Sequence, residues 1–309
     1  MAGDHSGQHH ADVHTHDHAP KNFGAVFAIA AGLNVALVVL QVVYGILANS
    51  VALLADAGHN FGDVLGLLLA WGAHVMAAAK PTPRHTYGFR SASILAALAN
   101  GIILLVATGA IAWEAVQRLF APGEVAGVTV MVVAGIGVVI NGASAWLLMA
   151  GQGEDLNIRG AFLHLVGDAA VSAGVIVAAG LILLTGWHWL DPVASLAISA
   201  VIVWSTWGLL RRSIDLSLAA VPRHIDPDAV RLYLQRLPGV VEVHDLHIWA
   251  MSTTETALTV HLVMPGGHPG DQLLRQLSRE LHDKFEIVHP TVQIEVDAAA
   301  CKLAPDHVV

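Results

Sequence analysis

The sequence predicts a membrane all-α bundle of six transmembrane helices, followed by a small cytoplasmic α+β domain of order αββαβ. Of the 309 residues, 55% are hydrophobic and 13% are charged, and soluble domains average about 25% charged residues. Alternating apolar and polar runs begin only after Arg212. Five stretches lack Asp, Glu, Lys and Arg, at 22–55, 91–113, 125–153, 169–190 and 192–210. Each is near or above the ~20 residues that cross a bilayer core.

The transmembrane domain is expected over 22–214, with helices at 22–48, 52–79, 91–120, 127–150, 158–185 and 190–214. The second helix, at 52–79, is apolar except for a few charges near its middle. A short turn at 45–50 makes the first two helices antiparallel neighbours. Opposite ends of the bundle differ in basic residues. Arg118 flanks one end, and seven residues flank the other: Lys21, Lys80, Arg84, Arg90, Arg159, Arg211 and Arg212. The positive-inside rule therefore places both termini in the cytoplasm.

Both tails are expected to lie outside the folded domains. Residues 1–21 hold six of the 19 histidines, which is typical of a disordered metal-collecting arm, although a solvated tail or a purification tag is an alternative. This polar start does not resemble a cleavable signal peptide. Residues 301–309 form a C-terminal tail with the only cysteine, Cys301, so an intramolecular disulfide framework is excluded. The net charge of −9 disfavours nucleic acid as a partner.

Residues 215–300 are expected to form the cytoplasmic domain. Asp226 is suited to cap a helix that begins at Pro227. The runs VVEVHDLHIWAM and TALTVHLVM flank a polar turn at 252–255 and predict a β-hairpin. The run GDQLLRQLSRELHDKF predicts a helix, and the strict alternation of TVQIEVD predicts a last strand. That alternation places Glu295 on the outward, exposed face of the strand.

Two H-x-x-x-D pairs lie within the predicted transmembrane helices: His59 with Asp63, and His164 with Asp168. Residues four apart share one face of a helix, so two adjacent helices can direct two imidazoles and two carboxylates at one point. This is the ligand count of a tetrahedral Zn²⁺ site. A charge at the bilayer centre costs roughly 3 kcal/mol, which favours a functional role over helix-packing hydrogen bonds. Asp56 is interpreted as a helix cap, or as a carboxylate near the membrane surface where the ion enters.

This set of ligands limits which metal ions the site can bind and which functions the protein can have. Imidazole suits Zn²⁺, Co²⁺, Ni²⁺ and Cu²⁺, whereas Mg²⁺ and Ca²⁺ prefer oxygen ligands, and no thiolate is present to favour Cu⁺. Four protein ligands leave no open position for an activated water, so the site is expected to hold and release an ion. Histidines titrate near neutral pH and lose a proton when they bind metal. The pattern predicts a metal/proton antiporter, not an enzyme. A passive divalent-cation channel, a metal sensor and a membrane metalloenzyme are the alternatives, although no H-E-x-x-H occurs.

The two pairs, the six helices, HTYGFRSASILAALANG (85–101) and VHDLHIW (243–249) resemble the cation diffusion facilitator family. The likeness is closest to bacterial zinc, cadmium and cobalt efflux members and to the vertebrate zinc transporters. It implies a homodimer in the lipid bilayer of the bacterial inner membrane. It also implies that each protomer exports Zn²⁺, and also Cd²⁺ or Co²⁺, by alternating access with protons as the counter-ion.

The resemblance further implies a cytoplasmic metal site at His244, His261 and Glu295. Surface histidines on a hairpin are the alternative, and His247 and Asp297 are further candidates for that site. His85 matches a family ligand in the loop between the second and third helices, but Thr82 stands where the family has a carboxylate. A strong metal site is therefore not expected around His85.

Overall fold

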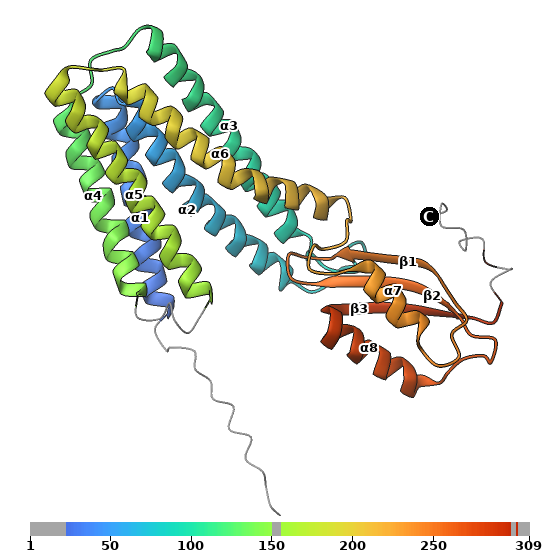
Figure 1. Ribbon diagram of the computed structural model, residues 1–309. Helices are drawn as coiled ribbons and strands as arrows, with labels where there is room; N and C mark the ends of the chain where they lie inside the picture. Colours follow the sequence, from blue (N-terminus) through green and yellow to red (C-terminus); the bar gives the residue numbers. More distant parts are fainter. Residues whose placement is uncertain (1–22, 150–155, 298–300, 302–309) are drawn as a thin grey trace, which may run out of the picture.

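The computed structural model describes residues 23–149, 156–297 and 301 (Figure 1). The His-rich arm at 1–21 and the tail beyond 301 lie outside the described residues. Six long helices form one bundle, and the small α+β domain follows at the end where α3 begins and α6 ends (Figure 1).

The six helices of the bundle lie close to the predicted ranges. They are α1 (Phe23–Leu47), α2 (Val51–Ala77), α3 (Ala92–Phe120), α4 (Gly127–Leu148), α5 (Leu156–Thr185) and α6 (Leu190–Ser217). Within the described residues, four segments are long and apolar enough to cross a membrane: Ala92–Phe120, Gly127–Trp146, Phe162–Thr185 and Leu190–Ser217. A shorter apolar stretch, Gly32–Leu47, lies in α1, and α2 carries the charged residues of the first H-x-x-x-D pair.

The start of α2 is fixed by two polar side chains. Ser50 is the N-cap, and its hydroxyl oxygen accepts a hydrogen bond from the Leu53 amide at 3.1 Å. Asp191, in the first turn of α6, accepts hydrogen bonds from the Ser50 hydroxyl and from the Val51 amide, the latter at 2.7 Å. A carboxylate at a helix N-terminus satisfies free amides and favours the helix dipole. This contact ties the beginning of α2 to the beginning of α6.

Close packing brings α2 to the centre of the bundle, where it contacts α1, α3, α5 and α6, while α4 packs along α5 and α3 along α6. Two glycines of α2 permit its approach to α3. A Cβ on Gly62 would lie 2.7 Å from Leu104 Cδ1, and one on Gly66 would lie 2.9 Å from Asn100 Nδ2. Small residues at such crossings let helix backbones come close.

The small domain has the predicted αββαβ order. Its elements are α7 (Pro227–Gln235), β1 (Glu242–Ala250), β2 (Thr256–Val263), α8 (Asp271–Phe285) and β3 (Ile287–Glu295). In the sheet, β2 is central, antiparallel to β1 and parallel to β3. Asp226 caps α7 as predicted, since its carboxylate accepts from the amides of Asp228 and Ala229. Both helices join the sheet in one apolar core that includes Val230, Leu234, Leu258, Leu277 and Leu281.

The start of α3 contacts the turn between β1 and β2. The guanidinium of Arg90 donates to the carboxylate of Glu255, and the Ser91 hydroxyl donates to the Met251 carbonyl at 3.2 Å. The two domains are therefore joined by direct polar contacts as well as by the chain after α6.

Candidate metal sites

The two H-x-x-x-D pairs meet across the contact between α2 and α5. His59 Nε2 lies 3.0 Å from Asp168 Oδ1, and His164 Nε2 lies 3.2 Å from Asp63 Oδ1. Each imidazole thus contacts the carboxylate of the other helix. This crosswise arrangement follows from the spacing, because each pair occupies one face of its helix and the two faces oppose each other.

Three of these four side chains form the tighter part of the cluster. One ligand atom each from His59, Asp63 and Asp168 lies within 4.8 Å of the others. His164 joins through its 3.2 Å contact with Asp63 and a 3.7 Å contact with Asp168 Oδ2. Its side chain is 50% exposed, whereas that of Asp168 is 5% exposed. Within the described residues, Asp63 Oδ2 is buried and has no hydrogen-bond partner, so it retains the capacity to bind an ion.

Asp56 lies inside the bundle, so its interpretation as a helix cap or a carboxylate near the surface is wrong. Its side chain is fully buried, and Oδ2 accepts from Gln41 Nε2 at 2.6 Å and from the Ser172 hydroxyl at 2.8 Å. Ser50 and Asp191 cap the helix instead. Since Ser172 lies four residues after Asp168, the Asp56–Ser172 bond links α2 to α5 one turn away from the His59–Asp168 contact. Asp56 therefore supports the position of the cluster.

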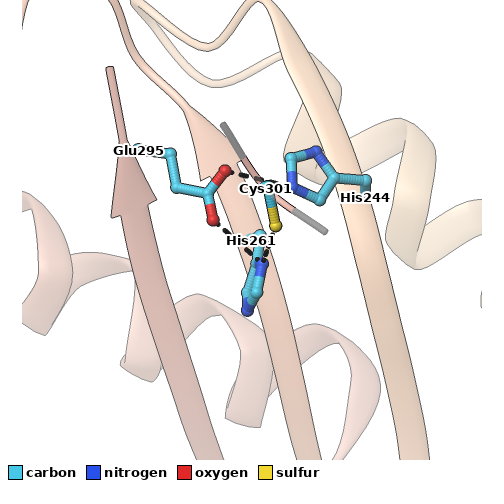
Figure 2. A group of neighbouring side chains, drawn as sticks. All are labelled: His244, His261, Glu295 and Cys301. Atoms are coloured by element: carbon cyan, nitrogen blue, oxygen red, sulfur yellow. Dashed lines mark hydrogen bonds and ion pairs between the residues drawn. The ribbon is translucent and has the colours of Figure 1, made fainter. Parts of the chain in front are cut away.

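A second cluster lies on the sheet of the small domain, where His244, His261 and Glu295 converge and Cys301 joins them (Figure 2). Glu295 Oε2 lies 3.2 Å from His244 Nε2, and Glu295 Oε1 lies 3.1 Å from His261 Nδ1. Cys301 Sγ lies 3.5 Å from the same Nδ1 atom of His261. One ligand atom from each of the four residues lies within 4.8 Å of all the others.

Strand register explains this convergence. His244 pairs with His261 across β1 and β2, and the parallel pairing of β2 with β3 brings Glu295 opposite Val263. His261 lies between Val260 and Leu262, which pack in the apolar core, so its side chain projects to the opposite face of the sheet.

A β-bulge lies next to the cluster, where the register of β1 shifts between His244 and His247. Asp245, in this bulge, has a φ of +50°. Its carboxylate lies 3.3 Å from His261 Nε2 and 2.8 Å from His247 Nε2. His247 therefore contacts Asp245 and is not a member of the cluster. A bulge lets two consecutive residues serve one site, which the hairpin pattern alone does not predict.

Both histidines of the cluster are buried, so the alternative of surface histidines on a hairpin is wrong. His244 is 2% exposed and His261 is 9% exposed, and the Glu295 side chain, predicted to face outward, is 12% exposed. Within the described residues, both ring nitrogens of His244 and Glu295 Oε2 lack a hydrogen bond of acceptable geometry, despite nearby carboxylate oxygens. Buried polar atoms without partners are costly, and a bound cation would satisfy them. The residues present therefore fit a metal ion.

Electrostatics around Glu295 favour its ionised form. Burial alone would raise the pKa of its carboxyl group. Hydrogen bonds from Gln293 and Cys301 and the charges of the two histidines outweigh burial and hold that pKa below its ordinary value. A carboxylate is the form that binds metal.

The other candidate residues are not part of either cluster. His85 lies in an exposed loop, where its Nδ1 is 3.2 Å from the Thr82 hydroxyl. Asp297 follows the end of β3 and is exposed. Cys301 was not predicted as a ligand, because it lies in the tail, six residues after Glu295, without a spacing motif.

Comparison with known proteins places these features in a family. Residues 27–216 match the cation efflux transmembrane domain, and residues 222–297 match the cytoplasmic domain of cation efflux proteins. The zinc transporter ZitB of Escherichia coli (strain K12) is 38% identical over 93% of this chain and 92% of that protein. The metal cation efflux system protein CzcD of Cupriavidus metallidurans is 36% identical over 94% and 92%.

Two further relatives complete the comparison. A cadmium, cobalt and zinc/H(+)-K(+) antiporter of Bacillus velezensis is 34% identical over 92% of each chain. The solved metal-bound C-terminal domain of the CzcD transporter from Cupriavidus metallidurans is 39% identical, with a TM-score of 0.22, over 23% of this chain and 99% of that chain. The relatives are named transporters and not enzymes, and the apolar helices make this chain a multi-pass membrane protein. The chain therefore belongs to the cation diffusion facilitator family of metal cation transporters.

Proposed function

We propose that this protein exports Zn²⁺, and also Cd²⁺ or Co²⁺, from the cytoplasm in exchange for protons. The observation that carries the proposal is the crosswise meeting of His59, Asp63, His164 and Asp168 between α2 and α5. The names of the relatives, which refer to zinc, cadmium and cobalt, support the same cargo. Two nitrogen and two oxygen ligands suit borderline cations of this kind.

Proton exchange follows from what the four side chains do without an ion. Each imidazole then lies beside a carboxylate, and a protonated imidazole forms a stable ion pair there. A cation binds imidazole only in its neutral form, so binding expels those protons. Metal and protons therefore compete for the same atoms, and each releases the other. That competition is the requirement for antiport.

Alternating access would move the ion past this point. The site lies between two helices, α2 and α5, so a shift of one against the other changes which side of the membrane the four ligands face. The basic residues at one set of helix ends support cytoplasmic termini in the inner membrane of a bacterium. The family match of the cytoplasmic domain supports assembly as a homodimer.

The second cluster would hold a resident metal ion. His244, His261 and Glu295 offer two nitrogens and a carboxylate on one sheet, and a zinc ion there would supply charge neutralisation and cross-link three strands. Its role is structural or regulatory, because it lies in the small domain, away from the bundle (Figure 1).

Transport by proteoliposomes tests the proposal. Liposomes that contain the purified protein should accumulate Zn²⁺ when an imposed pH gradient drives protons out of them. A pH-sensitive dye inside the liposomes should report the proton movement. Each of four alanine variants, at His59, Asp63, His164 and Asp168, should abolish the flux while the protein still inserts. The matched control is His74→Ala, an exposed histidine on the same helix. Zinc flux without proton movement would identify a channel, and wild-type flux in any of the four variants would refute the site.

A further inference from the structure

We propose that Cys301 supplies a thiolate ligand that completes a His₂-Glu-Cys metal site in the cytoplasmic domain and directs this site toward thiophilic divalent cations. This inference rests on the proposed metal binding by His244, His261 and Glu295. It adds a ligand of a different chemical class and a preference for Cd²⁺ and Zn²⁺.

The distances in the cluster match a tetrahedral ion. With metal–ligand bonds of about 2.0–2.3 Å, neighbouring ligands of a tetrahedral zinc ion lie about 3.3–3.8 Å apart. The separations of Glu295 from His244 and His261 are 3.2 and 3.1 Å, and that of Cys301 from His261 is 3.5 Å. All four ligand atoms lie within 4.8 Å of one another. Figure 2 shows the sulfur, both imidazoles and the carboxylate directed toward one point.

An independent observation indicates that a ligand belongs there. The side chain of His244 is 3% exposed, yet neither ring nitrogen has a hydrogen bond of acceptable geometry within the described residues. The nearest oxygens, from Glu242 and Glu295, lie 3.3 and 3.2 Å away. Such a ring is costly to bury without a partner. A metal ion between His244 and Cys301 removes that cost.

Polar neighbours support the four ligands from outside. Asp245 lies 3.3 Å from the ring nitrogen of His261 that faces away from Cys301. Gln293 donates to Glu295 at 2.8 Å. Metal-binding histidines usually have such a carboxylate partner on the second nitrogen, which orients the ring.

Sulfur changes which ions this site prefers. Thiolate is a soft ligand that favours Zn²⁺ and heavier thiophilic ions over Mg²⁺, Ca²⁺ or Mn²⁺. The bundle site has only imidazoles and carboxylates. The two sites should therefore rank ions differently, with Cd²⁺ favoured more strongly in the cytoplasmic domain than in the bundle. On binding, the thiol releases its proton and the sulfur–metal bond forms.

The chain has one cysteine, so any thiolate-to-metal charge-transfer absorption reports Cys301 alone. Full-length protein in detergent, kept reduced, is titrated with CdCl₂ and then with CoCl₂ while its ultraviolet and visible spectra are recorded. We expect a charge-transfer band whose final intensity corresponds to one thiolate–metal bond per chain, because the chain has one cysteine. Cys301→Ser should lack the band and should bind Cd²⁺ at this site at least about tenfold more weakly, as loss of even a supporting residue weakens metal sites tenfold.

Two further variants test whether the Cys301 sulfur binds the same metal ion as Glu295 and His244. Glu295→Gln and His244→Gln, chosen to limit changes in buried volume, should each diminish the band although Cys301 is still present. The control Asp63→Asn, in the bundle, should leave it unchanged. A wild-type protein that binds Cd²⁺ without the band overturns the proposal, and so does a full band in both the Glu295 and the His244 variant. Cys301→Ser should still transport Zn²⁺ in liposomes, so failure of the thiolate ligand is distinguishable from failure of the transport function.

Discussion

Replacing Asp56 by alanine should destabilise the bundle, because this carboxylate connects three helices. Its Oδ2 accepts from Gln41 of α1 and from Ser172 of α5, and all three side chains are fully buried. Alanine would leave two buried donors without partners, at about 1–3 kcal/mol each, which predicts a loss of roughly 2–6 kcal/mol. Asp56→Asn keeps one acceptor oxygen and removes a buried charge, so its loss should be smaller.

Equilibrium unfolding in detergent measures this difference. Wild type, Asp56→Ala and Asp56→Asn are unfolded with increasing denaturant, beside Ser144→Ala as a control. Ser144 is matched because, within the described residues, its hydroxyl donates to the Ile140 carbonyl of its own helix, so its loss should cost about 1 kcal/mol at most. Zinc transport should fall in Asp56→Ala, since α2 and α5 lose a contact next to His59 and Asp168. If Asp56→Ala unfolds at the same denaturant concentration as wild type, the network does not hold the helices.

Three further predictions concern selectivity, metal and pH. His59→Asp should keep transport but increase the flux of harder ions, because a carboxylate replaces a nitrogen ligand. Uptake of Zn²⁺, Cd²⁺ and Mn²⁺ by liposomes measures this change. An unchanged order of the three uptake rates contradicts the prediction. Zinc at about 100 times Kd should raise the unfolding free energy of the cytoplasmic domain by roughly 2.7 kcal/mol, and glutamine at both His244 and His261 should remove that gain in thermal melts. Hydrogen bonds from Lys284, Gln276 and Tyr233 lower the pKa of Glu280 from 4.5 to about 2. A lowered pKa contributes stability above the unfolded value that is lost as pH falls through the folded value. The protection factors of the α8 amides, which compare each measured hydrogen-exchange rate with the intrinsic rate at the same pH, should therefore fall between about pH 4.5 and 2 in wild type. Glu280→Gln should show less change.

The sequence alone was sufficient to predict the helices and strands and to predict that His59, Asp63, His164 and Asp168 lie together. Charge-free stretches predicted the helices, because a bilayer tolerates few charges, and the helix bounds agree within a few residues. The four-residue spacing of His59 with Asp63 and of His164 with Asp168 predicted their shared faces, since helical periodicity is a local property. Alternation in TVQIEVD predicted the last strand for the same reason, and the two runs around the polar turn at 252–255 predicted the hairpin of β1 and β2. The resemblance of VHDLHIW and its neighbours to the family pointed to His244, His261 and Glu295.

Tertiary structure decided what depends on contacts between distant residues. Asp56 became a buried link between three helices, not a cap, because Gln41 and Ser172 lie beside it only after α1 and α5 pack. Strand alternation placed Glu295 on the outward, exposed face of β3, yet strand pairing brings His244 and His261 onto that same face, so the Glu295 side chain is only 12% exposed. The place of Cys301 in the cluster likewise depends on a contact between distant residues. Its distance to His261 spans 40 positions of sequence, and no local pattern encodes a contact of that range.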